Sequence, residues 1–161
     1  MDTRAPLLEL RGLRTVFDLR ARSIAPVDGV DLTVGAGATV ALVGESGSGK
    51  SVTALSILRL LPGNARIDAG EIRLHAPGGA HDLARLDAEA MRAVRGAEIG
   101  MVFQEPMTSL NPVHRIGDQI AETLRAHGRC GRGEALDRAA AMLEAVGVPD
   151  PTRRLRAFPR S

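Results

Sequence analysis

The sequence predicts an α/β fold centred on a strand, a glycine-rich loop and a helix in direct succession. Residues 39–43 (TVALV) are apolar or β-branched without alternation, which is typical of a strand buried on both faces of a parallel sheet. Residues 44–49 follow as a loop of glycine, serine and one glutamate, and residues 51–61 then place apolar side chains at helical spacing. With 44% hydrophobic and 25% charged residues in 161, the composition is that of a globular protein.

Antiparallel strands are expected before this centre. Residues 8–10 alternate between leucine and a charged side chain, residues 13–17 continue the strand character, and residues 30–34 alternate again. Residues 18–26 are largely polar and are expected to form the loop between these strands.

A further strand and helix are expected in the middle of the chain. Residues 70–74 predict a short strand, residues 76–80 a loop, and residues 83–94 a weak helix. Residues 99–103 form a second continuous apolar run, which predicts another buried strand.

Two amphipathic helices are expected in the C-terminal third, over residues 115–127 and 133–146. Pro149 and Pro151 are expected to end the second helix, and the arginines of residues 153–160 to form a solvated terminus. One face of the second helix carries Leu136, Ala139, Leu143 and Val146.

Several classes of protein are excluded or disfavoured by the composition. The longest stretch without a charge, residues 32–44, is shorter than the roughly 20 residues that span a bilayer, and nothing resembles an export signal. A single cysteine, Cys130, cannot form an internal disulfide, which fits a cytoplasmic protein. A net charge of +2 without Trp or Tyr gives little reason to expect nucleic acid as a partner.

Other polar residues are interpreted as structural. The histidines lie at no metal-ligand spacing and are expected on the surface, and the acids near residue 85 are expected to form a solvated helix face. These residues are His75, His81, His114 and His127, and Asp82, Asp87 and Glu89.

The segment GESGSGKS at residues 44–51 carries the chemistry. It fits the phosphate-loop pattern G-x-x-x-x-G-K-[ST], in which glycines let backbone N–H groups approach phosphate oxygens and the helix N-terminus favours the anion. Lys50 is the only lysine in the chain, and its ammonium can reach the terminal phosphates, while the Ser51 hydroxyl can bind Mg²⁺. The predicted loop consists of Gly44, Glu45, Ser46, Gly47, Ser48, Gly49, Lys50 and Ser51.

A second informative stretch is IGMVFQEPMTSLNP at residues 99–112. Its apolar run ends in Gln104, whose amide can reach a metal ion or a water molecule beside a γ-phosphate. Taken by itself, Gln104 can equally be a residue that ends a strand.

The segments GESGSGKSV (residues 44–52) and VFQEPMTSLNP (residues 102–112) together resemble the ATP-binding subunits of ABC transporters, in the branch that imports oligopeptides, dipeptides or nickel. The resemblance covers nearly the whole chain. It implies an N-terminal antiparallel β part over about residues 1–38, a P-loop core over 39–104, and a Q-loop and helical part over 105–161.

The resemblance also implies roles for individual residues. Gly44 to Ser51 would form the Walker A loop for MgATP, and Gln104 would be the Q-loop glutamine that contacts Mg²⁺ and senses the γ-phosphate. Residues 105–112 would begin the surface that meets the membrane permease. Phe17 resembles the aromatic residue that stacks on adenine, although a core role is the competing interpretation.

The implied partners are permease subunits and a second ATP-binding subunit, with the protein peripheral on the cytoplasmic face of the membrane. The chain reads as the first part of such a domain, because no LSGG signature and no apolar run ending in Asp-Glu occur in it. We therefore expect nucleotide binding with little hydrolysis, and marginal stability from exposed apolar strand edges. The solute cannot be deduced.

Two alternatives stay open at this point. A small P-loop kinase would use Glu105 as its metal-binding acid and would transfer a phosphoryl group to a metabolite. A non-catalytic module that docks on a permease would need no nucleotide turnover.

Overall fold

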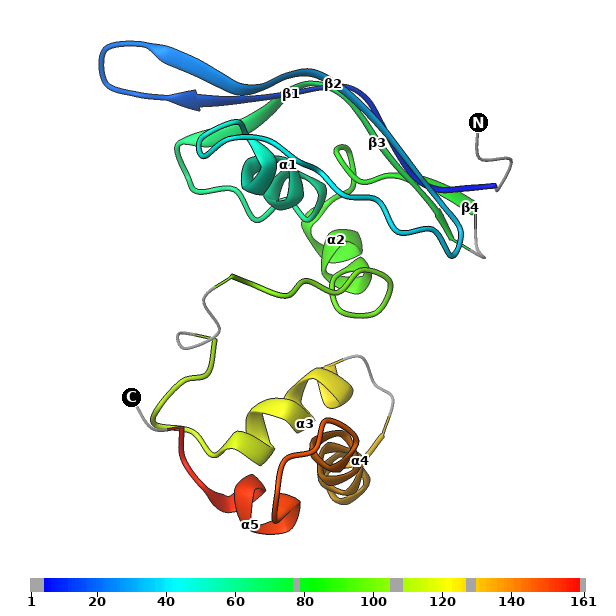
Figure 1. Ribbon diagram of the computed structural model, residues 1–161, viewed down its shortest axis with the longest axis vertical. Coiled ribbons are helices and arrows are strands. Elements are labelled where there is room, and N and C mark those ends of the chain that lie inside the picture. The colour runs from blue at the N-terminus through cyan, green and yellow to red at the C-terminus, as the bar shows by residue number, and fades with distance from the viewer. Residues whose placement is uncertain (1–4, 77–78, 105–108, 127–129, 160–161) are drawn as a thin grey trace. The chain divides into compact units, whose positions relative to one another are not determined.

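The computed structural model describes residues 5–76, 79–104, 109–126 and 130–159. The chain divides into two compact units, Met1–Glu98 and Ile99–Ser161. Both the strands and the phosphate-loop segment belong to the first unit, whereas the second unit is helical (Figure 1).

A four-stranded antiparallel sheet forms the body of the first unit. Its strands are β1 (Pro6–Asp18), β2 (Ser23–Gly35), β3 (Ala65–Ala76) and β4 (Gly79–Asp82), in the order β2-β1-β3-β4. The N-terminal antiparallel strands expected from their alternation are therefore confirmed, as is the strand expected after the glycine-rich loop.

The strands are longer than the sequence predicted, and the loops are correspondingly shorter. Leu19 N donates to Arg22 O at 2.9 Å, so a tight turn joins β1 to β2 and the loop expected over residues 18–26 is wrong for most of that range. Likewise, β4 takes up part of the loop expected over residues 76–80. Pairing of β2 to β1 and of β4 to β3 explains the two differences, because a ladder partner outweighs the weak strand propensity of polar residues.

The core of the first unit lies between the sheet and two helices, α1 (Lys50–Ile57) and α2 (Ala88–Val94), on one side of the sheet (Figure 1). Both helices are shorter than the ranges expected from periodicity. Six core residues are at most 2% exposed, namely Leu10, Leu13, Val27, Ile72, Leu83 and Met91.

The acids expected on a solvated helix face have structural roles instead. Asp87 is the N-cap of α2, since its carboxylate accepts from Ala90 N at 2.8 Å. Asp82 ends β4 and accepts from Ile72 N at 3.2 Å and from Ala84 N at 3.1 Å. Only Glu89, exposed in the first turn of α2, fits the original interpretation.

The histidines differ in environment, although all were expected on the surface. His75 and His81 are half-buried in β3 and β4, His114 is exposed, and His127 lies outside the described residues. His75 Nε2 lies 3.1 Å from Glu9 Oε2, and this hydrogen bond, aided by Arg11, holds the pKa of Glu9 below its ordinary value. Within the described ranges, no three His, Cys, Asp or Glu residues are placed to hold a metal ion.

Neither apolar run forms the buried strand that the sequence predicted. In residues 39–43, Val40 is 43% and Val43 88% exposed, and in residues 99–103 Val102 is 96% exposed. Neither run is part of the described sheet. An apolar run becomes a buried strand only when neighbouring strands complete its hydrogen-bond ladder, and neither run pairs with a strand of the described sheet.

Three helices make up the second unit: α3 (Ile116–Ala126), α4 (Arg132–Ala145) and α5 (Pro151–Arg156). The first two confirm the expected amphipathic helices. Small side chains at the contacts let the helices approach closely, and an added Cβ at Gly117 of α3 would lie 2.8 Å from Leu155 O of α5. Ile116 N also donates to Ala157 O at 3.0 Å, which ties α5 to the start of α3.

Helix α5 was not predicted, because the prolines around it were interpreted as stops. Pro151 occupies the first turn of α5, where its missing N–H costs nothing. The arginines expected in a solvated terminus are exposed on this helix, apart from Arg160, which lies outside the described residues. Val146 lies just beyond α4 and is 75% exposed, so it does not share the buried face predicted for it.

None of the described helices has both the length and the apolar character that crossing a membrane requires.

Candidate functional site

The glycine-rich loop of residues 44–49 leads directly into α1, as the sequence predicted. Its last residue, Gly49, is the N-cap of α1 and has φ 91° and ψ 0°. A Cβ at this position would lie 2.2 Å from Pro26 O, so the backbone of β2 leaves room only for glycine. The close approach fixes the start of α1 against the sheet.

Lys50 folds back over this loop. Its Nζ donates to Gly44 O and Glu45 O, each at 2.6 Å, and lies 3.3 Å from Ser48 Oγ. The ammonium is thus held at the mouth of the loop by backbone carbonyls. This position suits a compact cation that meets the terminal phosphates of a bound nucleotide.

The N-terminus of α1 is open to an anion. Among the described residues, no side chain caps this helix end, and its first turn contains no acidic residue. The unpaired N–H groups and the helix dipole therefore both favour negative charge at the loop. Ser51 is exposed in the first turn, where its hydroxyl can contribute to a cation site beside the phosphates.

Three hydroxyl groups that sequence reasoning missed support α1 from behind. Thr53 Oγ1 donates to Gly49 O at 3.0 Å, which closes the first turn of the helix. The buried hydroxyls of Thr15 and Ser56 lie 2.8 Å apart and connect β1 to α1. Thr53 and Ser56 lie three residues apart, on the buried face of the helix that follows the phosphate loop. Small polar residues on an otherwise apolar face are the sequence signal that would have pointed to them.

Phe17 lies near the end of β1, half-buried and paired with Ala65 on β3. It is two residues beyond Thr15, so both side chains point to the side of β1 that faces α1. Its role as an adenine contact stays a prediction.

Gln104 belongs to the second unit, where it is exposed and outside any helix or strand. Its role likewise stays a prediction. Residues 105–108 of the expected permease surface, including Glu105, lie outside the described residues. The remainder is anchored to α3, because Gln119 Oε1 accepts from Asn111 N at 2.7 Å and Gln119 Nε2 donates to Asn111 O at 2.9 Å.

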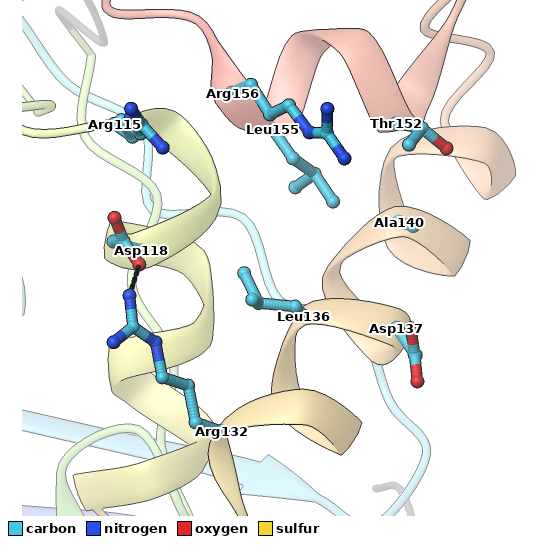
Figure 2. A pocket seen from close by; sticks show the side chains of 9 residues that line it. All are labelled: Arg115, Asp118, Arg132, Leu136, Asp137, Ala140, Thr152, Leu155 and Arg156. Atoms are coloured by element: carbon cyan, nitrogen blue, oxygen red, sulfur yellow. Dashed lines mark hydrogen bonds and ion pairs between the residues drawn. The ribbon is translucent and has the colours of Figure 1, made fainter.

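The second unit also contains a pocket of about 310 Å³ between α3, α4 and α5 (Figure 2). Leu136 and Leu155 point into it, and an ion pair between Arg132 and Asp118, at 3.2 Å, lies on its rim. None of the residues predicted to bind nucleotide lines this pocket.

A glycine-rich loop GESGSGKS that enters a helix beginning with lysine and serine is the phosphate-loop motif of the P-loop NTPases. The family model described as "ABC transporter" matches residues 27–160. The chain therefore belongs to the ABC transporter family.

Curated relatives agree with this assignment. The chain is 58% identical over 159 residues to a Brucella melitensis protein whose name assigns it to peptide import as an ATP-binding protein. It is 43% identical over 161 residues to the glutathione import ATP-binding protein GsiA of Salmonella choleraesuis. It is 42% identical over 154 residues to the oligopeptide transport ATP-binding protein OppD of Bacillus subtilis.

These alignments cover 98%, 99% and 95% of this chain but 47%, 26% and 42% of the relatives. The chain therefore spans at most about half the length of the curated relatives described here.

A solved structure agrees at the level of the fold. The dimeric ATP-binding cassette MJ0796, described in a post-hydrolysis state with ADP and Pi, matches with a TM-score of 0.77 at 23% identity. The match covers 94% of this chain and 61% of that chain.

Proposed function

We propose that this chain binds MgATP through residues 44–51, as part of an ATP-binding subunit that energises peptide import through a membrane permease. The observation that carries the proposal is the loop itself, in which the Lys50 ammonium is held at the mouth by Gly44 O and Glu45 O. Phosphate oxygens would replace these carbonyls as acceptors, and the backbone N–H groups of the loop would complete the anion site.

Mg²⁺ would be held by the Ser51 hydroxyl and by Gln104, together with nucleotide phosphates. Oxygen donors of this kind are what Mg²⁺ prefers, and an exposed hydroxyl at the first turn of α1 fits that requirement. When bound, the ion neutralises charge on the phosphates. Phe17 would stack on the adenine ring from the side of β1 that faces α1.

Peptides or similar small solutes are the proposed cargo, since two of the relatives described above are named for peptide or oligopeptide transport. The proposed partners are permease subunits, met by the surface that begins at residues 105–112, and a second ATP-binding subunit. The protein would lie on the cytoplasmic face of the membrane. Residues 1–38, 39–104 and 105–161 would act as its antiparallel, P-loop and helical parts.

Hydrolysis by these 161 residues alone is expected to be slow. Their sequence contains no LSGG segment and no apolar run that ends in Asp-Glu. The nucleotide would then lack an acidic partner for its metal ion and a group that polarises the attacking water.

The test is binding of a fluorescent ATP analogue to the chain and to Lys50→Ala. Removal of one charge-assisted contact to phosphate, worth about 1.5–3 kcal/mol, predicts a loss of affinity of about 10- to 100-fold. The matched control is Arg92→Ala, which removes an exposed positive charge from α2 and should leave binding unchanged. Equal affinity in Lys50→Ala and the parent chain would contradict the proposal, as would release of ADP that depends on an added phosphoryl acceptor.

A further inference from the structure

Helix α1 needs support at both ends. It has only eight residues, whereas isolated helices shorter than about 12–15 residues are marginal in water. Its direction in the folded protein therefore depends on what holds its termini. The N-terminal end is fixed by the contact between Gly49 and Pro26, and the C-terminal end by two arginines described next.

Arg59 ends the helix in a conformation that normally selects glycine. Its φ is 51°, in the left-handed region, and it follows the C-cap residue Leu58. Two hydrogen bonds close the turn: Arg59 N donates to Ser56 O at 3.0 Å, and Leu60 N donates to Leu55 O at 2.9 Å. This is the Schellman arrangement, in which a side chain at the left-handed position is disfavoured.

A contact made by the side chain of Arg59 explains why arginine, and not glycine, occupies this left-handed position. Its Nη1 donates to Leu86 O, the carbonyl just before Asp87, which is the N-cap of α2. Glycine would relieve the backbone but could not make this contact. Arg59 keeps an unfavourable backbone conformation and makes a contact between distant segments, which indicates that the contact is required.

Arg95 makes the reciprocal contact. It follows α2 as the C-cap residue, and its half-buried guanidinium donates from Nε to Leu58 O at 2.8 Å and from Nη2 to Arg59 O at 2.9 Å. These carbonyls lie at the C-terminal end of α1, where a cation is favoured by the helix dipole. Arg95 reaches the two carbonyls from two different nitrogens of one rigid planar group, so both bonds depend on the orientation of the guanidinium.

We propose that Arg59 and Arg95 are positioning residues that clasp the C-terminal end of α1 to the two ends of α2 and thereby fix the orientation of the phosphate loop. The inference rests on the proposed function, because it assigns the clasp to the nucleotide-binding loop. Along the chain, Arg95 is also nine residues before Gln104, so the clasp holds the start of the segment that leads to this second candidate contact.

Hydrogen exchange and nucleotide binding, both measured on the 161-residue chain, test this inference. Arg95→Lys keeps the charge but loses the fork, and Arg59→Gly keeps the left-handed turn but loses the contact with Leu86 O. We expect amide exchange without nucleotide to be about 10-fold faster over residues 44–58 in both variants and unchanged in the sheet. Affinity for the ATP analogue should fall about 3- to 10-fold.

The matched control is Arg92→Lys, the same substitution on the exposed face of α2, which should change neither quantity. Arg59→Gly also shows whether the effects come from general misfolding. Glycine is favoured at this φ, so the melting temperature of the variant should not fall. Unchanged exchange over residues 44–58, exchange accelerated equally throughout the sheet, or unchanged affinity in both variants would overturn the clasp. Absence of nucleotide binding by the parent chain, with exchange still accelerated locally, would instead contradict the proposed function alone.

Discussion

At Gly49, a left-handed backbone and a close approach coincide. Its φ is 91°, and an added Cβ would lie 2.2 Å from Pro26 O. Gly47 provides a natural comparison, because its φ is 84° but an added Cβ would meet nothing within 4 Å. A side chain at Gly47 would meet only the unfavourable backbone conformation, whereas a side chain at Gly49 would also clash with β2.

Alanine at these two positions gives a matched pair of variants. Gly47→Ala should lower the free energy of unfolding by about 1–2 kcal/mol, the usual cost of a side chain in the left-handed region. Gly49→Ala should cost more than Gly47→Ala, because the backbone of β2 must also move. Urea unfolding of both variants measures the difference, and equal midpoints would show that the contact with Pro26 does not constrain the loop.

At this scale the sequence was informative where a motif dictates geometry. The eight residues of the loop could be placed before helix α1, because glycine, lysine and serine at that spacing have few other uses. Arg59 and Arg95 could not be singled out, since their roles depend on carbonyls supplied by other parts of the fold.

Among the elements, α2 depends on its cap. The helix has seven residues, and the Asp87 carboxylate accepts from Ala90 N at 2.8 Å. Asp87→Ala removes this bond and should lower the free energy of unfolding by about 1 kcal/mol. Glu89→Ala, in the first turn of the same helix, is the control and should cost about 0.3–0.5 kcal/mol. Equal losses in urea unfolding would argue that Asp87 acts only through its charge.

Local pattern predicted some elements well and others poorly. Alternation identified β1 and β2, because a half-buried antiparallel strand records its two faces in its own sequence. The runs at residues 39–43 and 99–103 show only that these segments can be buried. Their apolar side chains do not specify a ladder partner, and the structure leaves Val43 88% and Val102 96% exposed. Helix α5 was missed because Pro151 was interpreted as a stop for the preceding helix, whereas α4 already ends at Ala145 and Pro151 begins α5.

At the scale of the whole molecule, the candidate nucleotide contacts are divided between two units. The first unit contains the phosphate loop and its supporting clasp, and the second contains Gln104 and three helices. The match to ABC transporters over residues 27–160 includes parts of both. Exposed apolar segments occur in each unit, so the expectation of marginal stability stays a prediction that urea unfolding can test.

The central claim is that residues 44–51 bind nucleotide, and its most direct test is a titration of the ¹⁵N-labelled chain with MgATP followed by NMR. We predict saturable shifts concentrated at the amides of residues 44–51 and the first turn of α1, and in Lys50→Ala the same shifts should require about 10- to 100-fold more MgATP. Absence of saturable shifts would contradict the claim, and so would shifts confined to the pocket between α3, α4 and α5.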